Sequence, residues 1–135
     1  MKVKQLFSYF VNLLGWIFVI SALVGCTSKN TIPLKDMPIS EFMIGEWKVI
    51  SRVNTDTGEA LEDRFPTISI YSKELSYGDT HRAEYSFIEE DLIFVDNKRL
   101  TGGETWRLEK DNGNLIVYQE FQGFKSTIRL ERVTR

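Results

Sequence analysis

Hydrophobic and polar residues alternate along most of the chain from residue 45 onward. In residues 45–53, Trp47 and Val49 fall on one face, while Lys48 and Arg52 fall on the other. The same period of two returns in residues 67–72, 83–87, 104–110, 114–119 (apolar on both faces) and 126–133. Such alternation over short segments predicts half-buried antiparallel strands.

Turn-forming sequences separate these segments at intervals of roughly ten residues, as in a meander whose strands pair with their sequence neighbours. They include "NTDTGE", "SYGDT", "TGG", "DNG" and "QGF". We expect an all-β fold, a small up-and-down antiparallel barrel of about eight strands. One of these strands lies in residues 92–96 or 98–100. Closing the sheet removes both exposed edges, although a two-layer sandwich is the alternative.

Large apolar side chains dominate the predicted inner face of this barrel. Eight strands enclose either packed side chains or one small ligand, so these residues predict a filled lower half and a shallow pocket at the mouth. Five of them are candidates to line a ligand cavity, namely Tyr85, Phe87, Trp106, Leu108 and Val117. The whole candidate interior consists of Trp47, Val49, Ile68, Ile70, Tyr85, Phe87, Trp106, Leu108, Leu115, Val117, Ile128 and Leu130.

Residues 36–45 predict one helical turn ahead of the first strand. We expect Asp36 at its N-cap and Pro38 in its first turn, where proline is tolerated. Ile39 and Phe42 then share an apolar face. Beyond this turn the sequence predicts no helix.

The N-terminal region follows another pattern. Lys2 and Lys4 precede an uncharged, mostly apolar stretch over residues 5–28. A positive flank, an apolar run and then small residues are the layout of a secretory signal peptide. The run is long, so a retained membrane-spanning helix is the alternative.

The four residues Leu23, Val24, Gly25 and Cys26 resemble the lipobox of bacterial lipoproteins. The resemblance implies that the first three are recognised by the signal peptidase and that the Cys26 thiol carries a diacylglycerol. The freed amine would be acylated too, and two or three acyl chains hold a protein stably at a membrane.

This resemblance divides the chain into three parts. Residues 1–25 are expected to be a cleaved signal peptide, residues 26–38 a lipidated tether, and residues 39–135 a lipocalin-like β-barrel domain. The expected location is the bacterial cell envelope. Thr27 after the cysteine favours the outer membrane, with the domain facing the periplasm.

Charge and cysteine content narrow the choice of partners. The formal net charge is −2, and loss of residues 1–25, with two lysines and no acid, moves it to −4. A mildly acidic domain argues against binding to nucleic acid, which requires a basic surface. Cys26 is the only cysteine, so the domain forms no structural disulfide.

Gly45 and Trp47 form a Gly-x-Trp sequence on the first strand, and Arg132 lies on the last. With the meander between them, they resemble the bacterial lipocalin-like domains of the calycin superfamily. There the tryptophan stands at the closed end of the barrel and the arginine lies across its indole. The resemblance implies that these three residues close the barrel through a cation–π contact. The sequence shows no long lid loop, which reduces the expected ligand capacity.

The sequence offers few candidates for catalysis. His81 is the only histidine, which rules out a three-histidine zinc site. It lies in the turn-like "YGDTHR", so we expect it to be an exposed turn residue. No nucleophile-elbow pattern accompanies it. The acidic run Glu89, Glu90 and Asp91 has the pattern of a solvated turn, not of a calcium loop. We therefore expect no enzyme activity, no cofactor and no metal site.

Two functions follow as hypotheses. In the first, the protein is a non-catalytic, lipid-anchored envelope lipoprotein whose barrel binds a small hydrophobic ligand or a partner protein. In the second, it is an interaction module, an inhibitor or accessory subunit of an envelope complex, with a filled barrel and no ligand. A lined cavity favours a ligand, whereas clustering of Tyr71, Tyr118 and Phe124 in one exposed patch favours a partner protein.

Overall fold

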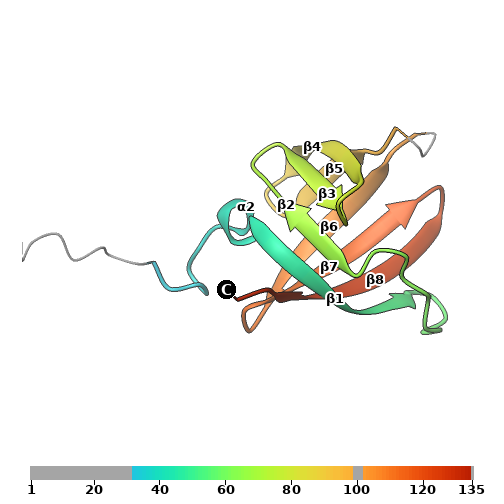
Figure 1. Ribbon diagram of the computed structural model, residues 1–135, viewed down its shortest axis with the longest axis horizontal. Coiled ribbons are helices and arrows are strands. Elements are labelled where there is room, and N and C mark those ends of the chain that lie inside the picture. The colour runs from blue at the N-terminus through green and yellow to red at the C-terminus, as the bar shows by residue number, and fades with distance from the viewer. Residues whose placement is uncertain (1–31, 99–101, 135) are drawn as a thin grey trace, which may run out of the picture. The chain divides into compact units, whose positions relative to one another are not determined.

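Eight antiparallel strands close into a barrel in the computed structural model, each pairing with its sequence neighbours and β1 pairing with β8 (Figure 1). The structure describes residues 32–98 and 102–134. The strands are β1 (Gly45–Asn54), β2 (Thr67–Ile70), β3 (Glu74–Tyr77), β4 (His81–Glu89), β5 (Leu92–Asp96), β6 (Glu104–Asp111), β7 (Asn114–Phe121) and β8 (Phe124–Arg132). The predicted all-β, up-and-down barrel is therefore confirmed, and the sandwich is excluded.

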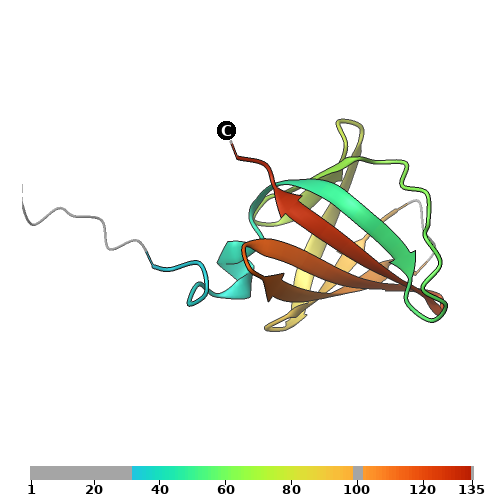
Figure 2. The same ribbon diagram turned by 90° about the horizontal axis from the view of Figure 1, so that it is seen from below.

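The short helix α2 (Ile39–Phe42) precedes β1 and lies at one end of the barrel, here called the closed end (Figure 2). Its N-cap is Pro38, without a side-chain cap. The expected cap at Asp36 is wrong, because the Asp36 amide donates to the Pro33 carbonyl in a turn before the helix. The predicted signal peptide, residues 1–25, lies outside the described residues.

The strand predictions agree with the structure except at β3. Of the two segments that could hold a further strand, residues 92–96 form it, as β5, while residues 99–101 are not described. Strand β3 was not predicted because it is only four residues long and contains Leu75 and Ser76, both buried. A segment so short and without alternation carries no strand signal.

Packed apolar side chains fill the closed half of the barrel, as the sequence analysis expected. Trp47, Trp106, Leu115 and Leu130 have no exposed surface, and Phe42 of α2 is also buried. Protein interiors of this kind are close-packed. The closed half therefore has no room for a ligand.

Phe87 is an exception to the predicted interior, since 42% of its side chain is exposed. The reason is the shortness of β3, which pairs with β4 only as far as Glu84. Tyr85 and Phe87 extend beyond the end of β3 and pack edge to face against each other. The Tyr85 hydroxyl donates to the Tyr71 carbonyl across this gap.

An irregularity in β1 changes which side chains enter the barrel. The register between β1 and β8 shifts between Val49 and Ser51. Beyond this bulge Arg52 lies opposite Ile128, a core residue. Because cross-strand partners share a face, Arg52 points inward. The sequence analysis placed it on the outer face, and a bulge is what reverses the alternation.

Candidate functional site

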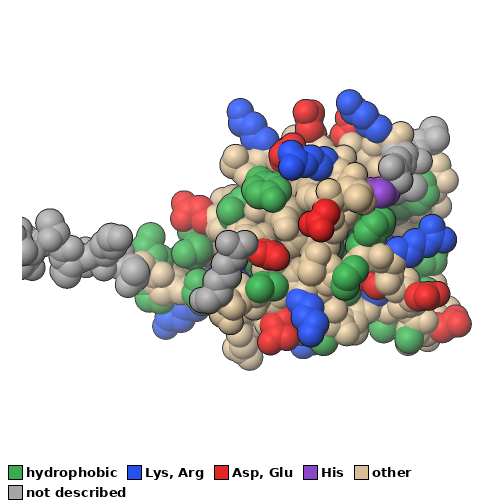
Figure 3. Space-filling model, viewed as in Figure 1, with side chains coloured by type: hydrophobic (Ala, Val, Ile, Leu, Met, Phe, Trp, Pro, Cys, Tyr) green, Lys and Arg blue, Asp and Glu red, His purple; other side chains and the backbone are tan. Residues whose placement is uncertain are grey.

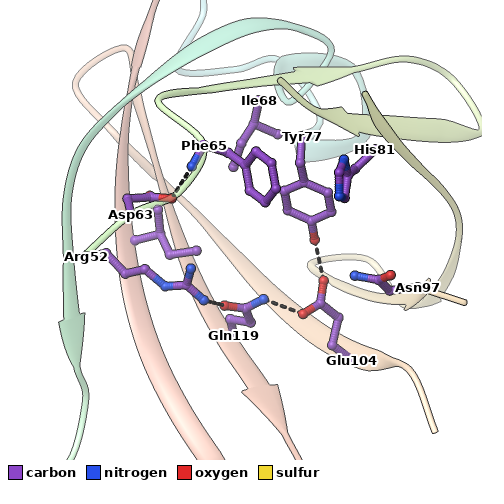
Figure 4. Close-up of a pocket in the computed structure, with 10 residues that line it drawn as sticks. Arg52, Asp63, Phe65, Ile68, Tyr77, His81, Asn97, Glu104 and Gln119 are labelled. Atoms are coloured by element: carbon purple, nitrogen blue, oxygen red, sulfur yellow. Dashed lines mark hydrogen bonds between the residues drawn. The ribbon is translucent and has the colours of Figure 1, made fainter. Parts of the chain in front are cut away.

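A cavity of about 160 Å³ opens at the mouth, the end of the barrel opposite α2 (Figure 4). Its floor lies where the packed core ends. The lining side chains come from the mouth ends of seven strands and from two adjoining loops, and most of them are polar or aromatic. They are Arg52, Asp63, Phe65, Ile68, Tyr77, His81, Asn97, Glu104, Gln119 and Ile128.

Glu104 is the most deeply buried charged group of the site, with 2% of its surface exposed. One carboxylate oxygen accepts a hydrogen bond from the Tyr77 hydroxyl, and the other accepts one from the Gln119 amide nitrogen (Figure 4). Among the described residues, none forms a salt bridge with Glu104. A buried carboxylate held only by neutral donors bears a large desolvation cost.

Gln119 connects Glu104 to Arg52. Its side-chain oxygen accepts hydrogen bonds from Nη2 of Arg52 at 2.6 Å and from Oγ of Ser126 at 2.9 Å. The three strands β1, β6 and β7 thus place a cation, an amide and a carboxylate in one continuous row. Such a network costs stability unless every member is satisfied.

Arg52 is not fully satisfied. Its Nε is buried and has no hydrogen-bond partner among the described residues. The indole Nε1 of Trp106, on the residue paired with Gln119 across the sheet, is likewise buried and unpartnered in that part of the chain. Buried donors without acceptors are rare in native proteins, so these two groups carry a desolvation cost at this end of the core.

Tyr77 keeps its proton in this environment. Burial raises the pKa of its hydroxyl well above the ordinary value, and the charge of Glu104 and the hydrogen bond to it raise this pKa further. The hydroxyl therefore remains a donor to Glu104 over the physiological range. It cannot act as a base there.

Three rings form the wall opposite the network. Phe65 belongs to the loop between β1 and β2, where its amide donates to the Asp63 carboxylate at 3.0 Å. Its ring packs against His81 and Tyr77, with centroids 4.8 and 5.9 Å away. His81 begins β4 and is half-buried, which corrects the expectation of an exposed turn residue. Its Nδ1 lies 2.6 Å from the Thr80 hydroxyl.

Part of this site was detectable from the alternation of the strands. Glu104 precedes Trp106 by two positions and Gln119 follows Val117 by two, so the period of two places both inside the barrel. Glu104 and Gln119 were nevertheless missed, because only apolar residues were taken as candidates for the interior. Arg52 carried no such signal, because the bulge in β1 is not visible in the pattern.

The five residues expected to line a ligand cavity do not line the cavity at the mouth. Trp106, Leu108 and Val117 belong to the buried core. Tyr85 and Phe87 lie at the edge left by the short β3. The sequence favoured large apolar residues as a lining, whereas in the structure these residues fill the barrel and polar ones border the space left over.

The structure brings together the three residues expected at the barrel closure. The Arg132 guanidinium lies over the Trp47 ring, 4.3 Å from its centroid. It also donates to the carbonyls of Ile44, at 3.0 Å, and Phe42. A Cβ on Gly45 would stand 2.8 Å from Nη1 of Arg132, so only glycine fits. Burial lowers the pKa of the arginine.

Trp47 completes this closed-end latch, which consists of Gly45, Trp47 and Arg132. Its indole nitrogen donates to the Met43 carbonyl at 2.8 Å. The latch therefore ties β1 and β8 to the end of α2. Its partners are all within the closed end, so we assign it a structural role.

The three exposed aromatic residues considered as a partner surface do not lie together. Tyr71 follows β2 at the closed end, whereas Phe124 begins β8 at the mouth and Tyr118 lies on the barrel side, so they form no single patch. Acidic and basic side chains are interspersed on the face seen in Figure 3. Arg107 pairs with Glu89 and Asp91 at the surface.

No group of three or more histidine, cysteine and acidic side chains in residues 32–98 and 102–134 is arranged to hold a metal ion. No helix in this part is long and apolar enough to span a membrane. The predicted lipobox, Leu23 to Cys26, lies outside it.

The geometry of the cavity is thus the main guide to function. Comparison of the chain with protein-family models, with curated proteins and with solved structures finds no match.

Proposed function

We propose that this protein is a non-catalytic, lipid-anchored protein of a bacterial cell envelope whose barrel binds a small polar molecule at its mouth. The single observation that carries the binding function is the hydrogen-bonded row Arg52–Gln119–Glu104 bordering a cavity. An apolar core at this position would stabilise the fold as well or better. Charged groups kept at a cavity are typical of a binding site.

The size of the cavity favours a small ligand over the hydrophobic one first expected. Pockets for drug-sized or lipid-like ligands occupy roughly 300–1,000 Å³, whereas this cavity has about 160 Å³. An acyl chain would also have to lie against the Arg52 guanidinium and the Glu104 carboxylate. Burying apolar surface there would desolvate both charged groups and give neither a counter-charge.

The anchor is proposed from the sequence, through the resemblance of Leu23 to Cys26 to a lipobox. An acylated Cys26 would hold the barrel at the membrane, most simply at the periplasmic face of the outer membrane. The acyl chains supply the membrane affinity, at about 0.8 kcal/mol per buried methylene. The barrel is then free to present its mouth to the aqueous compartment.

The anchor is tested by expressing the full chain in a diderm bacterium and measuring the intact mass of the purified product. We expect loss of residues 1–25 and the added mass of a diacylglycerol and an acyl group. The Cys26→Ser variant should keep its signal peptide and carry no lipid. Wild-type protein of unmodified full-length mass would refute the proposal.

Binding is tested by native mass spectrometry of the full chain purified gently in detergent from cell extract. We expect a small polar molecule to accompany the wild type and to be absent from Glu104→Gln. The control Glu90→Gln changes an exposed residue of the same type and should retain the ligand. Wild-type protein that is always empty, and that no small polar compound stabilises against heat, would favour the interaction module instead.

A further inference from the structure

We propose that the ligand of the mouth cavity is a small zwitterion, whose ammonium group pairs with Glu104 and whose carboxylate pairs with Arg52. This inference rests on the proposed function, because it names the ligand class of the same cavity. It is carried by the order of charges along the cavity, by the unused hydrogen-bonding capacity at each end, and by the size of the space.

The order of charges is set by three strands. Arg52 on β1 and Glu104 on β6 lie on opposite sides of Gln119 on β7, and both contact its amide (Figure 4). Arg52 donates to the amide oxygen and Glu104 accepts from the amide nitrogen. A positive and a negative group are thus held one amide apart on the same cavity wall.

Glu104 and Arg52, at the two ends of this row, each have more hydrogen-bonding capacity than their protein partners use. A carboxylate offers about four acceptor sites, and Glu104 uses one on each oxygen, toward Tyr77 and Gln119. A guanidinium has five N–H donors, and Arg52 uses one of them to bind the Gln119 side-chain oxygen. Its buried Nε has no acceptor among the described residues. Within residues 32–98 and 102–134, the hydrogen bonds of Glu104 and Arg52 thus leave acceptor capacity at one end and donor capacity at the other.

The amide of Gln119 indicates the spacing that a ligand must match. It presents an acceptor to Arg52 and a donor to Glu104 from adjacent atoms of one planar group. An ammonium and a carboxylate on the same carbon atom have the same order and a similar separation. Such a molecule can lie beside the Gln119 side chain and bind both charges in full, with charge-assisted hydrogen bonds.

The remaining walls limit the rest of the ligand. Phe65, Ile68 and Ile128 supply apolar surface beside the charged row. A cavity of about 150 Å³ holds a molecule the size of benzene, and the cavity here has about 160 Å³. We therefore infer an α-amino acid with a short apolar side chain, of the size of alanine or valine.

Charge selects against simpler ligands. Glu104 and Asp63 both line the cavity, and Arg52 is the permanent cation among the lining residues. A carboxylic acid without an amine would form an ion pair with Arg52 but would supply no cation for Glu104. An amine without a carboxylate would form an ion pair with Glu104 but would supply no anion for the Arg52 guanidinium. Only a molecule with both groups satisfies both ends.

The test is calorimetric titration of the detergent-purified full chain with four matched compounds of similar size. They are valine, isobutylamine, isobutyric acid and isobutyramide. We expect valine or alanine to bind, and the amine, the acid and the neutral amide to bind at least about tenfold more weakly, because each loses a charge-assisted contact.

Variants then assign each end. Glu104→Gln should weaken valine about tenfold or more without weakening the acid, whereas Arg52→Gln should weaken valine to a similar extent without weakening the amine. The controls Glu90→Gln and Arg82→Gln, both on exposed side chains, should bind valine as the wild type does. Should a cavity variant fail to fold, the four compounds on the wild type still decide.

The outcomes separate this inference from the proposed function. Equal binding of the amine and valine, or of the acid and valine, would overturn the zwitterion. Binding of other polar molecules in the cavity, with no response to zwitterions, would also overturn it and would leave the proposed function standing. A cavity that takes up no small molecule of any class would overturn both.

Discussion

Tyr77 shows how one buried hydroxyl links stability to the site. Because its pKa is raised by burial and by Glu104, the folded state holds this proton more tightly than the unfolded state does. The stabilisation is complete below the unfolded value of 10.0 and is lost as the pH rises toward the folded value. The cavity network is thus sensitive to alkali and insensitive to acid through this group.

The first prediction is that Tyr77→Phe removes this alkaline sensitivity. At neutral pH it should cost about 1–2 kcal/mol, because Glu104 loses a donor. Above the ordinary tyrosine pKa its free energy of unfolding should fall less steeply than that of the wild type. Denaturant titrations over a pH series measure both effects. Tyr71→Phe, on an exposed ring, is the control, and equal slopes for the two variants would contradict the argument.

Gly45 carries a second residue-level constraint. Its φ of +145° lies in the region that favours glycine, and its missing Cβ leaves space for the Arg132 guanidinium. Either constraint alone is costly for alanine. Together they explain a glycine at this position of the closed-end latch.

We expect Gly45→Ala to destabilise the protein by roughly 2–4 kcal/mol in denaturant titrations, from backbone strain plus displacement of Arg132. Gly58→Ala is the matched control. Gly58 also has a positive φ, +73°, but a Cβ there would meet nothing within 4 Å, so its cost should stay near 1 kcal/mol. Comparable losses for the two variants would show that the arginine moves aside freely.

At the scale of elements, Arg132 is the point at which β8, β1 and α2 are joined. Its side chain lies over Trp47 and Phe42, and it donates to two carbonyls near the end of α2. Four residues of helix cannot be stable alone. The position of α2 therefore depends on this arginine and on the burial of Phe42.

Arg132→Met should cost about 2–4 kcal/mol, because two carbonyls lose a charged donor and the cation–π contact is lost. The readout is the free energy of unfolding. Arg129, on β8 like Arg132, forms an exposed ion pair with Asp111. The control Arg129→Met removes this pair, and its cost should stay below about 1 kcal/mol. If both variants lost the same stability, the latch would have no special role.

Two elements differ from expectation for an identifiable reason. The bulge in β1 reverses the alternation and brings Arg52 inside, and β3 is too short to show alternation. Both depend on how neighbouring strands pair, which a single segment of sequence does not encode. The long strands β6 and β8 were predictable because each repeats its period several times, and β7 because it is a compact apolar run between two turns.

At the scale of the whole barrel, its two sides differ in the length over which neighbouring strands pair. The strands β6, β7, β8 and β1 pair over most of their length, whereas β2 and β3 have four residues each. Short strands open more readily than long ones. Ile68 and Tyr77, which line the cavity, belong to this weaker side.

Hydrogen exchange should therefore be fastest in Thr67–Ile70 and Glu74–Tyr77 among the strands and slowest in Asn114–Phe121 and Phe124–Arg132. The measurement is amide exchange followed by mass spectrometry. A ligand at the mouth should slow exchange in β2 and β3 selectively. Uniform protection of all eight strands would contradict this picture.

The sequence by itself determined the all-β barrel and most of the apolar inward positions of its strands, and it predicts an anchor at Cys26. These follow from local patterns, namely alternation of period two, turn residues and a short motif after an apolar run. Only the tertiary structure decided the binding site. A site made of Arg52, Glu104 and Gln119 depends on strand register and on one bulge, because these determine which polar side chains meet inside the barrel.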